Sequence, residues 1–208
     1  MKKFRYCILP LMILWISFLN VWFLQILKQS VTAPKENKKL DAVSLELKVF
    51  PIPTSSLHND YKIYYEDSFH AKRSFGGERV HEGCDLIASK QQRDLYPVLS
   101  MTDGIVSNVG YLNLGGYRIG ITSESDHYYY YAHLASYASA FTIGQRVCAG
   151  EILGFMGDTG YGIEPGTTGQ MPVHLHVGIY TNTKDGLKAI NPYPYLLKLE
   201  DSKLELSY

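Results

Sequence analysis

The segment Val173-His174-Leu175-His176-Val177 carries the clearest indication of the fold and of a functional site. Its alternating imidazole and aliphatic side chains predict a β-strand, in which His174 and His176 share one face about 6–7 Å apart. Two imidazoles on one face make a poor core and a suitable metal or proton-transfer site. On its own the pair is equally compatible with two ordinary surface histidines, so a site needs further ligands from elsewhere in the chain.

The composition favours one β-rich domain with an appendage. The chain has 208 residues and a formal net charge of zero, which is enough for one well-packed domain but short for two large ones. Its 18 glycines and 17 tyrosines favour strands joined by tight turns. No charge bias or long basic run indicates nucleic-acid binding, so no nucleic-acid partner is expected.

The N-terminus predicts a membrane anchor. Residues 6–27 are almost entirely apolar, and as a helix they span about 30 Å, enough to cross a bilayer. Basic side chains within residues 1–5 place the N-terminus in the cytoplasm and the long C-terminal domain outside, as a single-pass protein. Secretion after cleavage is the alternative, but the best cleavage site, after Ala33, is followed by the unfavourable Pro34.

The remaining chain divides into a linker, a domain and a tail. Residues 28–50 are polar and mixed in charge, which is typical of a linker or stalk, although residues 40–50 could form a strand at the domain edge. Residues 51–200 are predicted to form the domain, and residues 201–208 a C-terminal tail.

The domain is expected to be all-β and antiparallel. Short apolar or alternating runs are separated by Gly, Pro, Asn and Asp, and no amphipathic helix is predicted apart from a possible turn at 134–139. The predicted strands are 85–88, 104–110, 117–121, 127–133, 146–148, 152–156 and 173–180. Residues 157–172 are rich in Gly and Thr and are predicted to form a long loop beside the histidine strand.

Other residues can complete a metal site with the histidine strand. His81 and Asp85 lie four positions apart, and Gly83 between them permits a tight backbone path. Imidazole and carboxylate are good Zn²⁺ ligands, and His176 as a third ligand leaves one tetrahedral position open, as in catalytic sites. His133 ends a predicted strand, where its side chain can lean over a groove.

These motifs resemble the LytM/lysostaphin-type zinc metalloendopeptidases, which cut peptidoglycan cross-bridges and stem peptides. The resemblance covers residues 74–197, where the order and spacing of the motifs agree. The matching segments are Phe75-Gly76, His81–Asp85, Tyr131-Ala132-His133-Leu134, Gly144, Gly150-Glu151-Ile152-Leu153-Gly154, Gly157-Asp158-Thr159-Gly160, His174-Leu175-His176, Asn191-Pro192 and Tyr195-Leu196.

The resemblance implies an antiparallel β-sandwich with a groove, of the LytM type (similar to a duplicated hybrid motif), preceded here by one transmembrane helix. It implies one Zn²⁺ per chain on His81, Asp85 and His176, with His133 and His174 as the catalytic pair. The expected function is hydrolysis of peptidoglycan peptide bonds outside the membrane of a bacterium. Two departures from the family pattern are Cys84, where an aliphatic residue is usual, and the long lead-in at 168–173.

Several secondary expectations accompany this interpretation. Tyr129, Tyr131 and Tyr161 are predicted to line the substrate groove. Cys84 and Cys148 would both be exported, where a disulfide between them is chemically allowed. No protein regulator can be named.

Two alternatives to the enzyme stay open. The first is a membrane-anchored scaffold of the same fold that binds peptidoglycan or a partner protein without cutting, as in sporulation or division assemblies. The presence of all five expected site residues favours the enzyme over this scaffold. The second is a β-barrel metalloenzyme or sugar-binding protein of the cupin type, which does not predict the loop at 157–160 or the final Asn-Pro segment.

Overall fold

The computed structural model describes residues 42–75 and 77–208. The predicted membrane anchor and most of the predicted linker lie outside the described residues. Within the described part, no helix is both long and apolar enough to cross a membrane. Residues 42–208 group into one compact unit.

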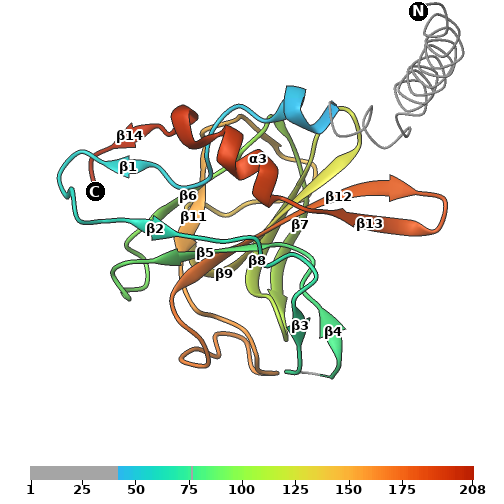
Figure 1. Ribbon diagram of the computed structural model, residues 1–208, viewed down its shortest axis with the longest axis horizontal. Helices are drawn as coiled ribbons and strands as arrows, with labels where there is room; N and C mark the ends of the chain where they lie inside the picture. The colour runs from blue at the N-terminus through green and yellow to red at the C-terminus, as the bar shows by residue number, and fades with distance from the viewer. Residues whose placement is uncertain (1–41, 76) are drawn as a thin grey trace, which may run out of the picture. The chain divides into compact units, whose positions relative to one another are not determined.

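A sheet of ten strands forms the centre of this unit (Figure 1). Its main path runs β10-β7-β8-β9-β12-β5-β2, and the strands that neighbour one another on this path are antiparallel. The strands on this path are β2 (Ile63–Tyr64), β5 (Cys84–Ala88), β7 (Gly104–Leu112), β8 (Gly116–Thr122), β9 (His127–Tyr137), β10 (Arg146–Val147) and β12 (His174–Thr183).

Three further strands complete this sheet, and two small sheets flank it. Strand β11 pairs with β6 and β9, and β13 pairs with β12; their bounds are β6 (Pro97–Leu99), β11 (Ile152–Met156) and β13 (Gly186–Ile190). The small sheets are the antiparallel hairpin of β3 (Lys72–Arg73) and β4 (Arg79–Val80) and the parallel pair of β1 (Thr54–Ser55) and β14 (Glu205–Leu206). The helical elements after β13 are α3 (Tyr193–Lys198) and the 3₁₀-helix η1 (Glu200–Ser202).

The predicted mostly-β, antiparallel architecture is confirmed. All seven predicted strands are present, and the strand at Ile152–Met156 has the predicted bounds. The turn predicted at 134–139 is wrong, because β9 continues to Tyr137, where it pairs with Gly154 of β11. Helix α3 was not predicted from the sequence. At its start, the Asn191 side chain accepts a hydrogen bond from the Tyr193 amide at 3.0 Å.

Both predicted ends of the domain are wrong. Residues 42–46 are helical, and Val43, Leu47 and Phe50 are buried in the core, so the domain begins inside the segment assigned to the linker. Val43 lies within this short helix and Leu47 and Phe50 follow it, so the segment is neither a free linker nor a strand. At the other end, β14 pairs with β1, and the Tyr208 hydroxyl donates to the Pro53 carbonyl at 2.7 Å, so residues 201–208 are part of the fold.

Strand alternation gives the central sheet a core face and a groove face. On β12, Leu175, Val177 and Ile179 are completely buried in the core. On β9, Tyr129 and Tyr131 also point into the core with no exposed surface, so the prediction that they line the substrate groove is wrong.

The two cysteines of the domain are not joined. Cys84 is buried at the start of β5, Cys148 is exposed after β10, and both thiols are free, so the predicted disulfide is wrong. Burial raises the pKa of the Cys84 thiol to about 12, so Cys84 acts as a small apolar core residue.

Candidate metal centre

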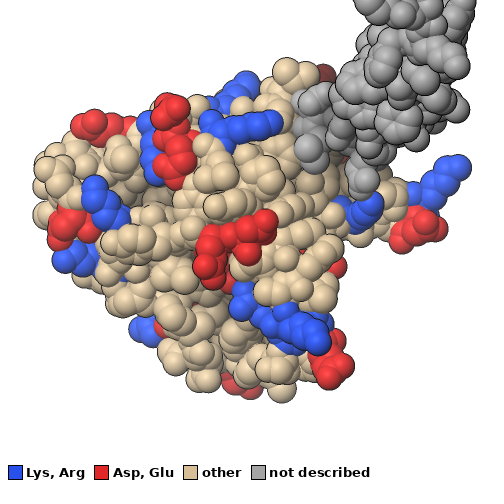
Figure 2. Space-filling model, in the orientation of Figure 1, with Lys and Arg blue, Asp and Glu red and all other residues tan. Residues whose placement is uncertain are grey.

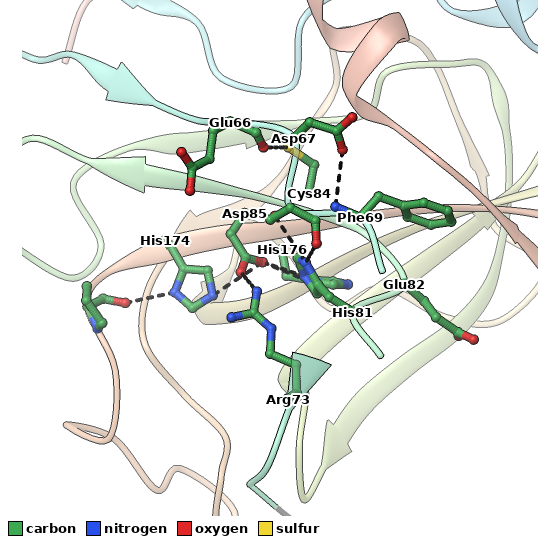
Figure 3. Close-up of polar contacts among 12 residues, drawn as sticks. Glu66, Asp67, Phe69, Arg73, His81, Glu82, Cys84, Asp85, His174 and His176 are labelled. Atoms are coloured by element: carbon green, nitrogen blue, oxygen red, sulfur yellow. Dashed lines mark hydrogen bonds and ion pairs between the residues drawn. The ribbon is translucent and has the colours of Figure 1, made fainter. Parts of the chain in front are cut away.

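His81, Asp85 and His176 converge at the start of β12 (Figure 3). Asp85 of β5 lies directly opposite His176 of β12 in the antiparallel register, so their side chains leave the sheet on the same face. His81 Nε2 lies 2.9 Å from His176 Nδ1, and each of these nitrogens lies 3.0 Å from Asp85 Oδ1. Pairing of distant strands therefore brings together donors that are 95 positions apart in sequence.

The donor set fits a zinc ion. Ligand atoms bound at about 2.0–2.2 Å around a tetrahedral Zn²⁺ lie roughly 3.3 Å from one another. The three donor atoms here lie 2.9–3.0 Å apart, and two are imidazole nitrogens and one is a carboxylate oxygen. These residues could hold Zn²⁺ with only small outward shifts, and three protein ligands leave room for a fourth.

Outer contacts orient the ligands. His81 Nδ1 faces the Ser68 carbonyl and hydroxyl oxygens, each at 3.1 Å, which directs Nε2 towards Asp85. Arg73 donates to Asp85 Oδ2 at 2.7 Å and leaves Oδ1 for the histidines. Burial opposes ionisation of Asp85, but its contacts with the His176 and His81 rings outweigh it and hold its pKa well below the usual range. The carboxylate is therefore charged at neutral pH.

Gly83 is required for clearance around His176. A Cβ atom at position 83 would lie 2.4 Å from His176 Cε1 and 2.6 Å from Nε2, closer than such atoms approach in proteins. The sequence suggested instead that Gly83 serves a tight backbone path. The structure shows that the glycine lets the backbone just before β5 pass directly beside an imidazole of β12.

A bulge in β9 delivers His133 to the groove. The β8–β9 register shifts between Tyr117↔Leu134 and Ile119↔Tyr131, and His133 has a φ of 63°, an uncommon conformation for a residue other than glycine. The His133 amide still donates to the Gly115 carbonyl at 2.8 Å. Because of the bulge, His133 leaves the buried face of Tyr131 and lines the groove.

His133 and His174 lie side by side next to the metal cluster. Their ring centroids are 4.6 Å apart, and His174 Nε2 is 3.9 Å from Asp85 Oδ1. His133 Nδ1 donates to the Thr159 carbonyl and His174 Nδ1 to the Pro172 carbonyl, both at 2.8 Å. A carbonyl only accepts, so each Nδ1 carries the proton and each Nε2 is free to accept one. Burial, followed by the neighbouring His174 and His176, lowers the pKa of His133 well below its usual value, so it is neutral at pH 7.

These groups line a groove of about 530 Å³. Of the three predicted groove tyrosines, Tyr161 is in the lining, whereas the sequence argument missed Tyr130 and Tyr180. Strict alternation along β9 puts Tyr130 and His133 on opposite faces, so Tyr130 was not predicted to line the groove. The bulge before His133 brings both side chains to the groove. The groove residues are Arg73, Arg79, Val80, His81, Glu82, Asp85, Leu114, Gly115, Tyr130, Ala132, His133, Tyr161, His174, His176 and Tyr180.

The profile of Peptidase family M23 matches residues 79–192. This range is more than half of the chain and includes the three metal-cluster residues and both neighbouring histidines. The chain belongs to peptidase family M23. The family is zinc-dependent and consists mostly of endopeptidases, and the His-Asp-His cluster is compatible with that metal.

Individual relatives of this M23 chain have different named activities. It is 39% identical over 147 residues to the L-Ala–D-Glu endopeptidase of Bacillus subtilis, covering 71% of this chain and 42% of the relative. It is 34% identical over 145 residues to the glycyl-glycine endopeptidase ALE-1 of Staphylococcus capitis, covering 69% of this chain and 36% of the relative. The chain thus spans less than half the length of these two curated relatives.

A solved structure shows the same fold. A Ruminococcus gnavus protein provisionally named glycyl-glycine endopeptidase LytM superposes with a TM-score of 0.73 at 49% sequence identity. The match covers 79% of this chain and 64% of that one. The LytM/lysostaphin-like fold expected from the sequence is therefore confirmed.

Proposed function

We propose that the chain is a zinc-dependent endopeptidase that hydrolyses peptide bonds in peptidoglycan stem peptides or cross-bridges. The observation that carries this proposal is the placement of two kinds of group on one groove. Three convergent donors could hold the metal, and two further imidazoles, His133 and His174, present unprotonated Nε2 atoms beside them. A purely structural metal site has no use for the second pair.

The residues have complementary roles in this hydrolysis. His81, Asp85 and His176 would hold a zinc ion, whose Lewis acidity would acidify water and polarise a carbonyl group. His133, neutral at pH 7, accepts the proton of the attacking water through Nε2. His174, beside it, is placed to share this proton and to donate to the leaving amine. The backbone carbonyls of Thr159 and Pro172 keep both rings in the tautomer that these steps need.

We also propose that residues 6–27 anchor the chain in the cell membrane, with the catalytic domain on the outer side. The apolar length and the preceding basic residues support this placement. Protease treatment of intact spheroplasts tests it. Degradation of the domain without lysis of the cells is expected, whereas a domain protected until lysis would contradict the proposal.

The deciding test of activity uses the full chain purified in detergent. One zinc per chain is expected, together with release of peptides from purified cell walls, loss of that release on chelation and its recovery on adding Zn²⁺. Mass analysis of the fragments then names the bond. One bound zinc without cleavage of several wall types would contradict the enzyme and support the non-lytic scaffold, and a folded chain without zinc would exclude a metallopeptidase.

A further inference from the structure

Arg79 is a positively charged group on the wall of the groove that the proposed hydrolysis does not use. We propose that it binds a carboxylate of the peptide substrate, which makes the groove selective for acidic peptides over uncharged ones. This inference rests on the proposed function and specifies the substrate class.

The β3–β4 hairpin places Arg79 over the groove. The hairpin lies beside the connection that leads into β12 (Figure 1), and Lys and Arg side chains gather on its surface (Figure 2). Arg79 of β4 lines the same groove as His81 of the metal cluster, only two residues further along the chain. A group bound by Arg79 therefore lies beside the reaction centre.

Neutral partners hold the Arg79 side chain in place. Its NH2 nitrogen donates to the Tyr161 hydroxyl at 3.2 Å, and its Nε donates to the Phe75 carbonyl at 3.4 Å. The Tyr161 ring in turn stacks on Phe75 with centroids 4.5 Å apart. These contacts orient the guanidinium across the groove but leave its charge uncompensated.

The neighbouring Arg73 shows the contrast. Its charge is met by Asp85 at 2.7 Å, whereas no carboxylate lies within ion-pair distance of Arg79 among residues 42–75 and 77–208. The other acidic residue of the groove, Glu82, is exposed, and its side chain points away from the Asp85 cluster (Figure 3). Arg79 is thus prepared for an anion that arrives with the substrate.

The chemistry of a guanidinium defines that anion. Its five N–H donors form a planar fork that matches a carboxylate, and only two of the five are used by Tyr161 and Phe75. A stem peptide with a free carboxylate next to the scissile bond supplies this partner, and an oligoglycine bridge does not. Arg79 therefore favours cleavage beside an acidic residue of the stem peptide.

The test compares two synthetic stem peptides that differ only in a carboxylate or a carboxamide beside the scissile bond. With the zinc-loaded full chain in detergent, kcat/KM is expected to be at least about tenfold higher for the carboxylate peptide. Arg79→Gln should bring the ratio of the two rates to about one and keep one zinc per chain. Arg146→Gln, at the exposed position of β10, is the matched control and should keep the preference.

Equal rates for the two peptides with the wild-type chain would overturn the inference, as would a preference that persists in Arg79→Gln. If neither peptide is cut, the proposed function fails, and the Kd values of the same two peptides for the zinc-loaded chain decide the inference separately. Tighter binding of the carboxylate peptide that Arg79→Gln removes supports the role of Arg79, and equal Kd values exclude it.

Discussion

Three imidazoles at the groove are each held by the backbone through one ring nitrogen. Nδ1 of His81, His133 and His174 meets a backbone carbonyl at 2.8–3.1 Å. Because these acceptors carry no proton, they set one tautomer and direct each Nε2 inwards. In the proposed mechanism, the same kind of contact orients a metal ligand, His81, and two proton-transfer groups, His133 and His174.

Single substitutions should separate zinc binding from turnover. Asp85→Ala is expected to lose both zinc and activity, because the two remaining imidazoles lose their charged co-ligand. His133→Ala is expected to keep one zinc per chain and to lose about 10²–10⁴-fold in kcat, the usual contribution of a positioned acid or base. Metal analysis and peptide hydrolysis measure the two effects. His58→Ala, an exposed histidine, is the control. Wild-type turnover by His133→Ala would refute the assignment.

A methyl group at Gly83 should weaken the metal site. Gly83→Ala forces its Cβ against the His176 ring, which must move away from Asp85, so zinc affinity should fall by at least tenfold. Competition with a chromogenic chelator measures the affinity. Gly186→Ala, in the β12–β13 hairpin and with open space around it, is the matched control. Its φ of 107° should make it cost about 1 kcal/mol of stability, with no change in zinc affinity.

At the scale of elements, the connection between β11 and β12 braces the bulge of β9. The Thr159 hydroxyl donates to the Leu134 carbonyl at 2.6 Å and accepts from the Tyr117 amide at 3.0 Å. The Thr159 carbonyl holds His133. At the next position, Asp158 is anchored by Arg93 through both carboxylate oxygens. The predicted loop, which is rich in Gly and Thr, is therefore tied to β8 and β9 by hydrogen bonds.

Removing the Thr159 hydroxyl should disturb His133 without disturbing the metal. Thr159→Val leaves the buried Leu134 carbonyl and the partly buried Tyr117 amide without their partner, which costs about 1–3 kcal/mol and lets the bulge relax. A fall in kcat of about tenfold or more is expected, with zinc content unchanged. Thr183→Val removes a similar hydroxyl contact in the exposed β12–β13 turn and should leave kcat unchanged. If both variants keep full turnover, the loop does not position His133.

At the scale of the whole molecule, residues 42–50 complete the core. Val43, Leu47 and Phe50 are buried. Glu46, on the same short helix as Val43, accepts hydrogen bonds from His127 at 3.0 Å and the Tyr129 hydroxyl at 2.8 Å. The Glu46 side chain is only 13% exposed, so it is a buried acceptor for groups of the central strand β9. The segment that leads into the domain is therefore packed as part of it.

Loss of the Glu46 carboxylate should destabilise the whole domain. Glu46→Ala leaves the His127 and Tyr129 donors without an acceptor, which should lower the free energy of unfolding by about 1–3 kcal/mol at pH 7. Glu124→Ala, on an exposed turn, is the control and should change it by less than about 0.5 kcal/mol. Urea unfolding followed by the near-ultraviolet circular dichroism of the tyrosines measures both.

The effect of Glu46 should depend on pH in one direction. Burial opposes ionisation of Glu46, but hydrogen bonds from Ser123, Ser125, Tyr129 and His127 outweigh it and lower its pKa. A carboxyl with a lowered pKa stabilises the fold fully above its ordinary value of about 4.5 and progressively less as pH falls through its folded value. The stability difference between wild type and Glu46→Ala should therefore shrink below pH 4.5, and a difference that grows there would contradict this account.

The sequence by itself determined the strands of the sheet and the identity of the residues at the site. Alternation along a strand is a local property, so it placed β11 and predicted that His174 and His176 share a face. Both histidines line the groove, as two side chains on the same face of one strand should. The ability of His81 and Asp85 to bind a metal could also be predicted, because the ligand atoms of a side chain do not depend on the fold.

Only the tertiary structure decided how those residues meet and where the domain ends. The bulge that sends Tyr131 to the core and His133 to the groove depends on the register with β8 and on the Thr159 loop. The packing of residues 42–50 and the free Cys84 thiol depend on neighbours that are distant in the sequence. Bulges, close approaches and ion pairing are properties of pairs of segments, and local alternation contains no information about which segments become neighbours.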